Sequence, residues 1–265
     1  MRTQIAPSRT TRLVVLTVVG VIFLIPIVAM LEFSLRAGLD GGYNLGHWTA
    51  IFDPENERTY RNLFRGVTNS LILAVVTVVL MLILLVPTMV LVKLRLPRLE
   101  RPLELICLLP ITIPAIVLVV GLAPVYSVVA RFFGANAWTL SFAYVILVLP
   151  YAYRAIQANL ISVDVVTLAE AARTLGAGWG TVIARVIVPN LRRGMLAAAV
   201  ISVAVVLGEY TIASLLNRIN LQTAVVQVSR SDPYAAVIFA LLALAFGFLL
   251  LFILGRSSRP SRRPS

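Results

Sequence analysis

The chain has 265 residues, of which 60% are hydrophobic and only 13% are charged, and its formal net charge is +12. This composition excludes an ordinary water-soluble domain, because a soluble surface of this size needs far more polar side chains. The chain is therefore expected to lie in a membrane. Its spanning segments are expected to be helices, since lipid cannot pair exposed backbone N–H and C=O groups. The alternating ten-residue segments of a membrane β-barrel do not occur in the sequence.

Long apolar stretches predict the spans in chain order. A helix crosses the hydrocarbon core with about 20 apolar residues. Five stretches of this kind carry no charge, and a sixth is interrupted only by Glu209. The six predicted spans are 13–31, 66–92, 105–130, 132–153, 194–216 and 233–255. The sequence therefore predicts an all-α polytopic membrane protein with one six-span domain at 13–255, a basic N-terminal segment at 1–12 and a basic tail at 256–265.

The distribution of cations predicts the orientation. If the N-terminus lies in the cytoplasm, 16 of the 23 Lys and Arg residues fall in inner segments. This bias places both termini on the cytoplasmic side of the membrane. The first span is interpreted as uncleaved, because its apolar run is longer than a signal-peptide core of about 7–15 residues. The excess positive charge then meets anionic lipid headgroups, so we expect no nucleic-acid partner.

The residues that carry most enzyme chemistry are scarce. The chain has one His and one Cys, and its single Lys, Lys93, lies outside any GxxxxGK[ST] phosphate loop. No group of residues has the spacing of metal ligands. We therefore expect no catalytic residue, no metal, no cofactor and no ATPase site in this chain. A membrane-embedded enzyme is disfavoured for the same reason, since Glu209 is the one carboxylate expected inside a span.

A polar stretch between the fourth and fifth predicted spans interrupts this apolar pattern. Thr167 and Glu170 have the spacing of a capping box, which predicts the start of a short helix. Gly176 is expected to stop that helix in a left-handed conformation. Residues 179–188 predict a second short helix, ended by Pro189. The residues alone leave two interpretations open, an amphipathic helix on the membrane surface and a helix pair that docks against another protein.

The same stretch resembles a known motif. Glu170, Ala171 and Ala172 are followed after three residues by Gly176 and after nine more by the segment Val186–Pro189. This spacing is similar to the EAA loop of bacterial ABC importer permeases, with Val186 and Val188 in place of the usual Ile and Leu. The resemblance implies a MetI-like transmembrane domain in the bacterial inner membrane, with the EAA coupling loop at 160–193.

The resemblance also implies partners. In that family the loop fits a cleft in a cytoplasmic ABC ATPase dimer, so Glu170, Ala171, Ala172, Gly176 and Pro189 become the candidate coupling residues. Six spans form half of such an importer. A second, different six-span permease is therefore implied, together with an external or periplasmic substrate-binding protein and membrane lipid.

The substrate is approached through a looser resemblance and one carboxylate. The stretch Gly208–Leu216 (GEYTIASLL) is similar to permeases for polyamines, ferric iron, thiamine or aminoethylphosphonate. Counted from Gly194, Glu209 lies about 22 Å deep at about 1.5 Å per residue, where it can meet a cation. Glu209 and Tyr210 are the candidate substrate-path residues, and polyamines the first interpretation. Alternatives are a structural Glu209 that pairs with Arg218 or bonds between subunits and, for the whole chain, a self-contained channel or secondary transporter.

Overall fold

The computed structural model describes residues 8–38 and 41–257, and within this part of the chain all regular secondary structure is helical apart from one bridge between Arg36 and Tyr43. Residues 1–7 and 258–265, which belong to the predicted basic ends, lie outside the described residues. The chain divides into two compact units. One contains the described residues up to Arg61 together with 225–245, and the other contains 62–224 and the described residues from 246.

The smaller unit is organised around the loop that follows α1 (Arg9–Leu35). After the Arg36–Tyr43 bridge, the short helix α2 (Gly46–Ile51) begins. The ring of His47 in α2 stacks on Tyr234 of α13 (Pro233–Ser257) with 3.8 Å between centroids. Stacked rings fix the position of α2 against the start of α13. The apolar window of α1 has no buried residue, as expected for a helix that faces lipid or another chain.

Helix α3 (Glu57–Arg95) is the longest element and runs from the smaller unit into the larger one. Its first turn carries Glu57 and its last turn carries Lys93 and Arg95, which match the positive and negative ends of the helix dipole. At about 1.5 Å per residue this helix is about 58 Å long. It begins nine residues before the predicted second span, so part of the predicted external segment is helical.

The core of the larger unit lies between α6 (Ser141–Val163) and α10 (Arg192–Gly208). Each helix contributes a row of buried residues spaced four apart. On α6 this row is Tyr144, Val148, Ala152 and Ile156, and on α10 it is Gly194, Ala198, Ser202 and Val206. Rows with this spacing interdigitate when two helices pack. A Cβ atom added at Gly194 would lie 2.7 Å from Cβ of Asn159, so the absence of a side chain allows the close approach.

The predicted third span is wrong as a single helix. Its residues form α4 (Glu100–Leu108), a 3₁₀ turn η4 (Leu109–Thr112) and α5 (Ala115–Phe133). Pro110 and Pro114 explain the break, since proline cannot donate a backbone hydrogen bond and restricts the preceding residue. The predicted fourth span is displaced, because η5 (Ala137–Leu140) and α6 begin after Gly134 and α6 continues to Val163.

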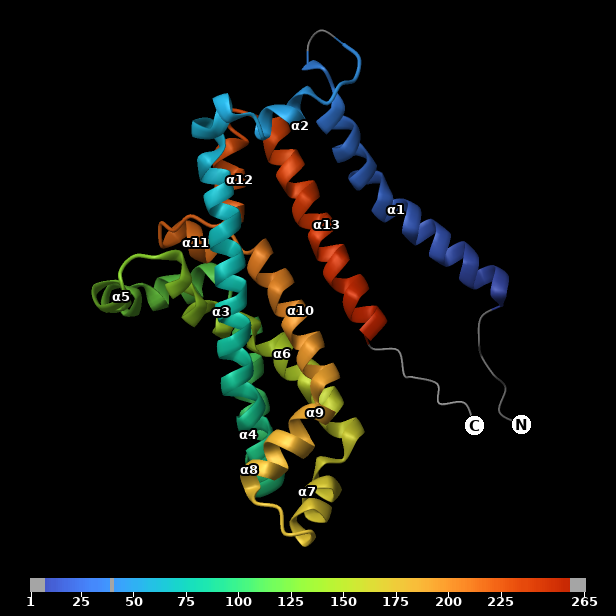
Figure 1. The fold of residues 1–265 in the computed structure, drawn as a ribbon, viewed down its shortest axis with the longest axis vertical. Coiled ribbons are helices and arrows are strands. Elements are labelled where there is room, and N and C mark those ends of the chain that lie inside the picture. Colours follow the sequence, from blue (N-terminus) through green and yellow to red (C-terminus); the bar gives the residue numbers. More distant parts are fainter. Residues whose placement is uncertain (1–7, 39–40, 258–265) are drawn as a thin grey trace. The chain divides into compact units, whose positions relative to one another are not determined.

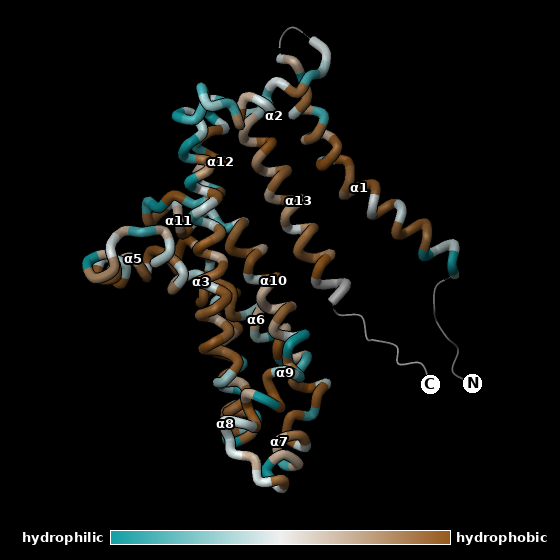
Figure 2. The backbone as a smooth tube through the Cα atoms, viewed as in Figure 1, coloured by the Kyte–Doolittle hydropathy of each residue, from teal (hydrophilic) through white to brown (hydrophobic). Residues whose placement is uncertain are grey.

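The predicted fifth span is also interrupted. Helix α10 ends at Gly208, and the chain continues as the short helices α11 (Thr211–Leu215) and α12 (Leu221–Val228). Within the described residues, five helices are long and apolar enough to span a membrane, and a sixth span is reached if the bent pair that contains α10 counts as one. Figure 2 shows the apolar character along α3 and α10. The predicted all-α polytopic membrane fold is confirmed.

Candidate functional site

The polar stretch between α6 and α10 folds into short helices at the end of the larger unit (Figure 1). The first is α7 (Val165–Thr174). The predicted capping box is wrong, because the N-cap is Asp164 and not Thr167. The Asp164 carboxylate accepts hydrogen bonds from the backbone N–H and the hydroxyl of Thr167, at 3.4 and 2.7 Å. The carboxylate therefore starts the helix three residues earlier than predicted.

Gly176 ends α7 in the predicted left-handed conformation, with φ at +85°. The N–H of Ala177 donates to the carbonyl of Ala172 over 3.1 Å, and the N–H of Gly176 donates to the carbonyl of Arg173 over 3.0 Å. These two bonds form a Schellman motif, which satisfies the last carbonyls of the helix. The chain can therefore reverse tightly after α7 without leaving those groups unpaired.

The return segment is helical in three pieces, α8 (Trp179–Thr181), a π-helical stretch η6 (Val182–Ile187) and α9 (Val188–Asn190). Pro189 was predicted to end this segment, but the helix continues through it to Asn190. The wider π-helical turn ends at Ile187, two residues before Pro189, whose nitrogen cannot donate a regular helical hydrogen bond. The segment then bends by 67° into α10. Residues 179–190 and α10 therefore lie along different axes.

The candidate coupling residues do not all face the same way. Glu170, Ala171, Gly176 and Pro189 are exposed, whereas Ala172 is half-buried and packs against the core of its own unit. Leu175, which the sequence analysis did not single out, is 88% exposed at the tip of the loop. The sequence signal that could have identified Leu175 is its apolar side chain in a polar loop, directly before the glycine that stops the helix. Glu170, Ala171, Leu175 and Gly176 lie on the α7 side of the reversal between α7 and α8, whereas Pro189 lies in α9, at the end of the return segment.

Two ion pairs hold α4 beside this region. Lys93 Nζ of α3 lies 3.0 Å from Glu100 Oε1, and Arg154 Nη1 of α6 lies 2.9 Å from Glu104 Oε1. Because Glu100 and Glu104 are four residues apart, both carboxylates project from neighbouring turns of one short helix. Helix α4 is thus tied to α3 and to α6.

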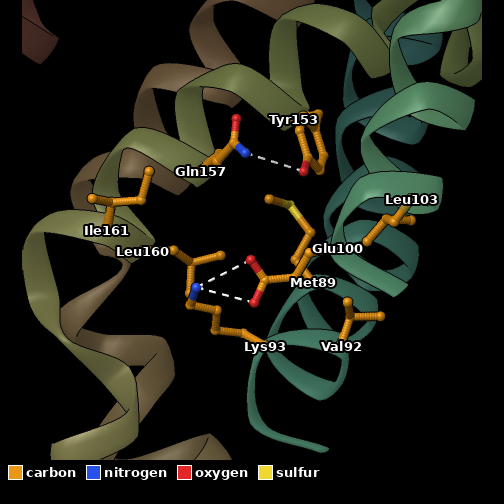
Figure 3. Close-up of a pocket in the computed structure, with 9 residues that line it drawn as sticks. All are labelled: Met89, Val92, Lys93, Glu100, Leu103, Tyr153, Gln157, Leu160 and Ile161. Carbon is orange, nitrogen blue, oxygen red and sulfur yellow. Dashed lines mark hydrogen bonds and ion pairs between the residues drawn. The ribbon is translucent and has the colours of Figure 1, made fainter. Parts of the chain in front are cut away.

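A small pocket of about 100 Å³ lies beside the Lys93–Glu100 pair, between α3, α4 and α6 (Figure 3). Gln157 Nε2 donates a hydrogen bond to the hydroxyl of Tyr153 across its wall, over 3.2 Å. The lining residues are Met89, Val92, Lys93, Glu100, Leu103, Tyr153, Gln157, Leu160 and Ile161. The polar groups drawn in the pocket are engaged with one another, so its geometry indicates a packing gap between three helices.

Glu209 lies at the break between α10 and α11, and it is 7% exposed. Its carboxylate accepts a hydrogen bond from the hydroxyl of Tyr144 over 2.5 Å and from the backbone N–H of Ile212 over 2.7 Å. The Nδ2 group of Asn220 donates to the Glu209 carbonyl over 2.6 Å and to the Tyr144 hydroxyl over 3.3 Å. Helix α6, helix α11 and Asn220, the residue before α12, are therefore joined by hydrogen bonds around Glu209.

The same break is attached to α3. Asn69 Nδ2 donates to the carbonyl of Ile219 over 2.8 Å, and the N–H of Leu221 donates to Ser70 Oγ over 2.8 Å. Gly66 completes the contact, since a Cβ atom there would lie 2.7 Å from the Asn220 carbonyl oxygen. Side chains of α3 thus form hydrogen bonds with backbone groups that the interruption of the fifth span leaves free. Buried backbone groups require such partners.

Tyr210 and Arg218 lie on either side of α11. Tyr210 is 41% exposed. Arg218 does not pair with Glu209 in the described structure, and its Nη1 instead donates to the Leu216 carbonyl over 2.9 Å. The Nε atom of Arg218 is buried and has no hydrogen-bond partner among the described residues. Among the same residues, no group of three or more His, Cys, Asp and Glu side chains has the arrangement of a metal site.

The fold and the features described above define the general class of protein to which the chain belongs. Apolar helices of spanning length, an exposed polar helix pair at one end and a broken span held by buried hydrogen bonds together describe a polytopic helical membrane protein.

Residues 62–263 match the family described as binding-protein-dependent transport system inner membrane component. This match covers well over half of the chain, which therefore belongs to that family of ABC importer permeases. No curated protein matches the chain in a whole-sequence comparison. The chain is thus a transport subunit of a binding-protein-dependent importer and not itself an ATPase, and its family works with an ATPase and a binding protein.

Proposed function

We propose that this chain forms one half of the translocation path of an importer, beside a second and different six-span permease, with both termini in the cytoplasm. Residues 160–193 couple this path to a dimer of cytoplasmic ATPases. The observation that carries the proposal is the ordered helix pair α7 and α8–α9, which projects from the end of the larger unit (Figure 1). A rigid projection of this kind transmits force from a separate soluble subunit to the spans.

The exposed residues at the reversal between α7 and α8 form the proposed coupling surface, defined as Glu170, Ala171, Leu175 and Gly176. The exposed Pro189 of α9 is the further candidate coupling residue. Glu170 supplies a charge, Ala171 allows a partner backbone to approach closely, and Gly176 makes the tight reversal that presents them. Leu175 supplies an apolar anchor of the kind that carries binding energy when it fills a pocket. Ala172 supports this surface from behind, since it packs inward.

Glu170→Lys tests the coupling role. The reversed charge is expected to reduce co-purification of the ATPase by at least tenfold while the permease still inserts in the membrane. Glu57→Lys, in the first turn of α3 at the predicted external end, is the matched control and should leave co-purification unchanged. Parental co-purification and parental uptake by Glu170→Lys contradict the proposal.

We propose polyamines as the substrate class. Glu209 supports this choice as a carboxylate at a break in a span, and the adjacent Tyr210 presents an exposed aromatic ring that attracts ammonium groups. The Glu209 carboxylate already accepts hydrogen bonds from Tyr144 and Ile212 of its own chain, so it holds α11 in place and contributes negative potential to the path. Tyr210 is then the residue that touches the substrate. The second candidate is aminoethylphosphonate, which Arg218 favours because the Nε atom of its guanidinium has no hydrogen-bond partner in the described part of the chain.

The substrate is tested with the reconstituted importer and its external binding protein. We expect putrescine or spermidine to bind that protein and to stimulate ATP hydrolysis. Stimulation by aminoethylphosphonate alone supports the second candidate and contradicts the first. Solute flux through the permease alone, without ATPase and ATP, supports a self-contained channel and contradicts the importer mechanism.

A further inference from the structure

The aromatic ring of Trp179 is in cation–π contact with two arginine side chains. The guanidinium carbon of Arg95 is 4.1 Å from the centroid of the ring, and that of Arg173 is 5.3 Å from it. Both distances are within the range of about 6 Å in which a cation is attracted to a ring, and Trp is the strongest aromatic partner. Trp179 is half-buried, whereas both arginines are exposed. We refer to the three residues Arg95, Arg173 and Trp179 as the Trp179 stack.

The two arginines come from different parts of the unit. Arg173 belongs to the last turn of α7, and its Nη1 group donates to the carbonyl of Ala177 over 2.8 Å. Arg173 therefore holds Trp179 and the reversal loop together within the coupling segment. Arg95 is the last residue of α3, about 80 residues earlier in the sequence. The Trp179 stack thus joins the coupling segment to the end of the longest helix.

The local backbone explains why the ring reaches this position. Gly176 reverses the chain, and Gly178, with extended backbone angles, is the N-cap of α8. Trp179 is therefore the first helical residue of the return segment and lies directly after the tight reversal.

The end of α3 has a second connection, through which a movement of this end also reaches α4. Lys93, two residues before Arg95, forms the ion pair with Glu100 that holds α4. A displacement of α8 that acts on Arg95 therefore acts on α3 and α4 together.

We propose that Trp179 is a positioning residue that transmits displacement of the coupling segment to α3 through Arg95. The ATPase moves α7 and α8, Arg173 keeps Trp179 fixed to α7, and the stacked Arg95 carries that motion to the end of α3. This inference rests on the proposed coupling function and adds the residue through which the motion enters a span.

The test uses the complete importer in proteoliposomes, with the binding protein and spermidine as the probe. Trp179→Ala is expected to retain the bound ATPase but to lose at least fivefold of the stimulation of ATP hydrolysis by loaded binding protein. Arg95→Ala should reproduce this loss, and the double variant should be no worse than either single one, because both remove the same contact. Trp179→Phe, which keeps an aromatic face, should restore most of the stimulation. Arg98→Ala removes a nearby exposed cation and should behave as the parent.

A distance measurement makes the test independent of the substrate. Nitroxide labels at Leu91 of α3 and at Arg185 of η6, both exposed, report the separation of the two segments in a Cys107→Ala background. In the parent, the distance distribution should stay narrow and unchanged between the nucleotide-free and ATP–vanadate states. In Trp179→Ala it should broaden or shift between those states.

The outcomes separate the two proposals. An unchanged distribution and parental stimulation in Trp179→Ala overturn the role of the Trp179 stack. Failure of the parental chain to bind the ATPase contradicts the coupling function instead. In that case the width of the distribution in the isolated permease still decides whether Trp179 fixes α8 to α3.

Discussion

The hydroxyl of Tyr144 donates a hydrogen bond to Oε2 of Glu209 over 2.5 Å, although the two residues are 65 positions apart in the sequence. Tyr144 is fully buried in the row of α6 that faces α10, and Glu209 lies where α10 ends. The bond therefore fixes the interrupted fifth span to the best-packed helix of the larger unit. It also assigns a structural role to the carboxylate, next to the substrate-path role proposed for its neighbour Tyr210.

Tyr144→Phe removes the hydroxyl that Glu209 and Asn220 share. Loss of a hydrogen bond to a charged group costs about 1.5–3 kcal/mol, which corresponds to a melting temperature lower by roughly 3–12 °C for a chain of this size. Thermal unfolding of the purified permease in detergent measures the change. Tyr151→Phe on the exposed side of the same helix is the control and should change the melting temperature by less than about 2 °C. Equal effects of the two variants contradict the structural role of the Tyr144–Glu209 bond.

Tyr210→Ala tests the proposed contact with an ammonium group. A cation–π contact is worth about 0.5–1 kcal/mol at an exposed site, so the concentration of spermidine for half-maximal uptake should rise about two- to fivefold. Tyr210→Phe keeps the ring and should stay close to the parent. Uptake assays in proteoliposomes distinguish the two variants. Parental uptake by Tyr210→Ala removes Tyr210 from the substrate path.

Gly176→Val tests the backbone of the reversal. The position has φ at +85° with open space around it, so the penalty comes from the conformation and not from a clash. A β-branched residue there costs about 1–2 kcal/mol, and the ATPase should co-purify less while the permease still inserts. Gly176→Asn is the matched control, because Asn tolerates the left-handed region. If Val and Asn reduce co-purification equally, side-chain bulk and not backbone conformation is responsible.

Gly194→Ala tests the close packing of α6 and α10. The added Cβ atom would meet Asn159 Cβ at 2.7 Å and the Ala155 carbonyl oxygen at 3.1 Å. Such overpacking typically destabilises by about 1–3 kcal/mol. Gly121→Ala in α5 has no neighbour within 4 Å and should be neutral or stabilising by up to about 1 kcal/mol. Thermal unfolding in detergent compares them, and equal melting temperatures contradict the packing argument.

The length of the apolar stretches and the distribution of charged residues were sufficient to predict the helical membrane fold and the approximate positions of its spans. The helix boundaries were less predictable. The apolar run 105–130 satisfies the length of a span, and only the positions of Pro110 and Pro114 reveal that it divides into α4 and α5. The continuation of α3 to Glu57 was missed, because its first two turns are polar.

The candidate site shows the same limit at the level of side chains. Gly176 was predictable, since a glycine after an Ala-rich helical segment is a common stop. Asp164 was missed as the N-cap, because Thr167 and Glu170 offered an equally good local pattern. The contacts of Trp179 with Arg95 and of Glu209 with Tyr144 join residues far apart in sequence, so a local pattern contains no information about them.

Photo-cross-linking from Leu175 tests the central claim most directly, because this residue lies at the tip of the proposed coupling surface and is almost fully exposed. A benzophenone amino acid is placed at Leu175 in the complete importer, and the same group at Tyr43, in the predicted external loop, is the control. The account predicts a cross-linked product of this chain with the ATPase from position 175 and none from position 43. An intact complex that gives no ATPase cross-link from position 175, or gives it equally from position 43, contradicts the claim.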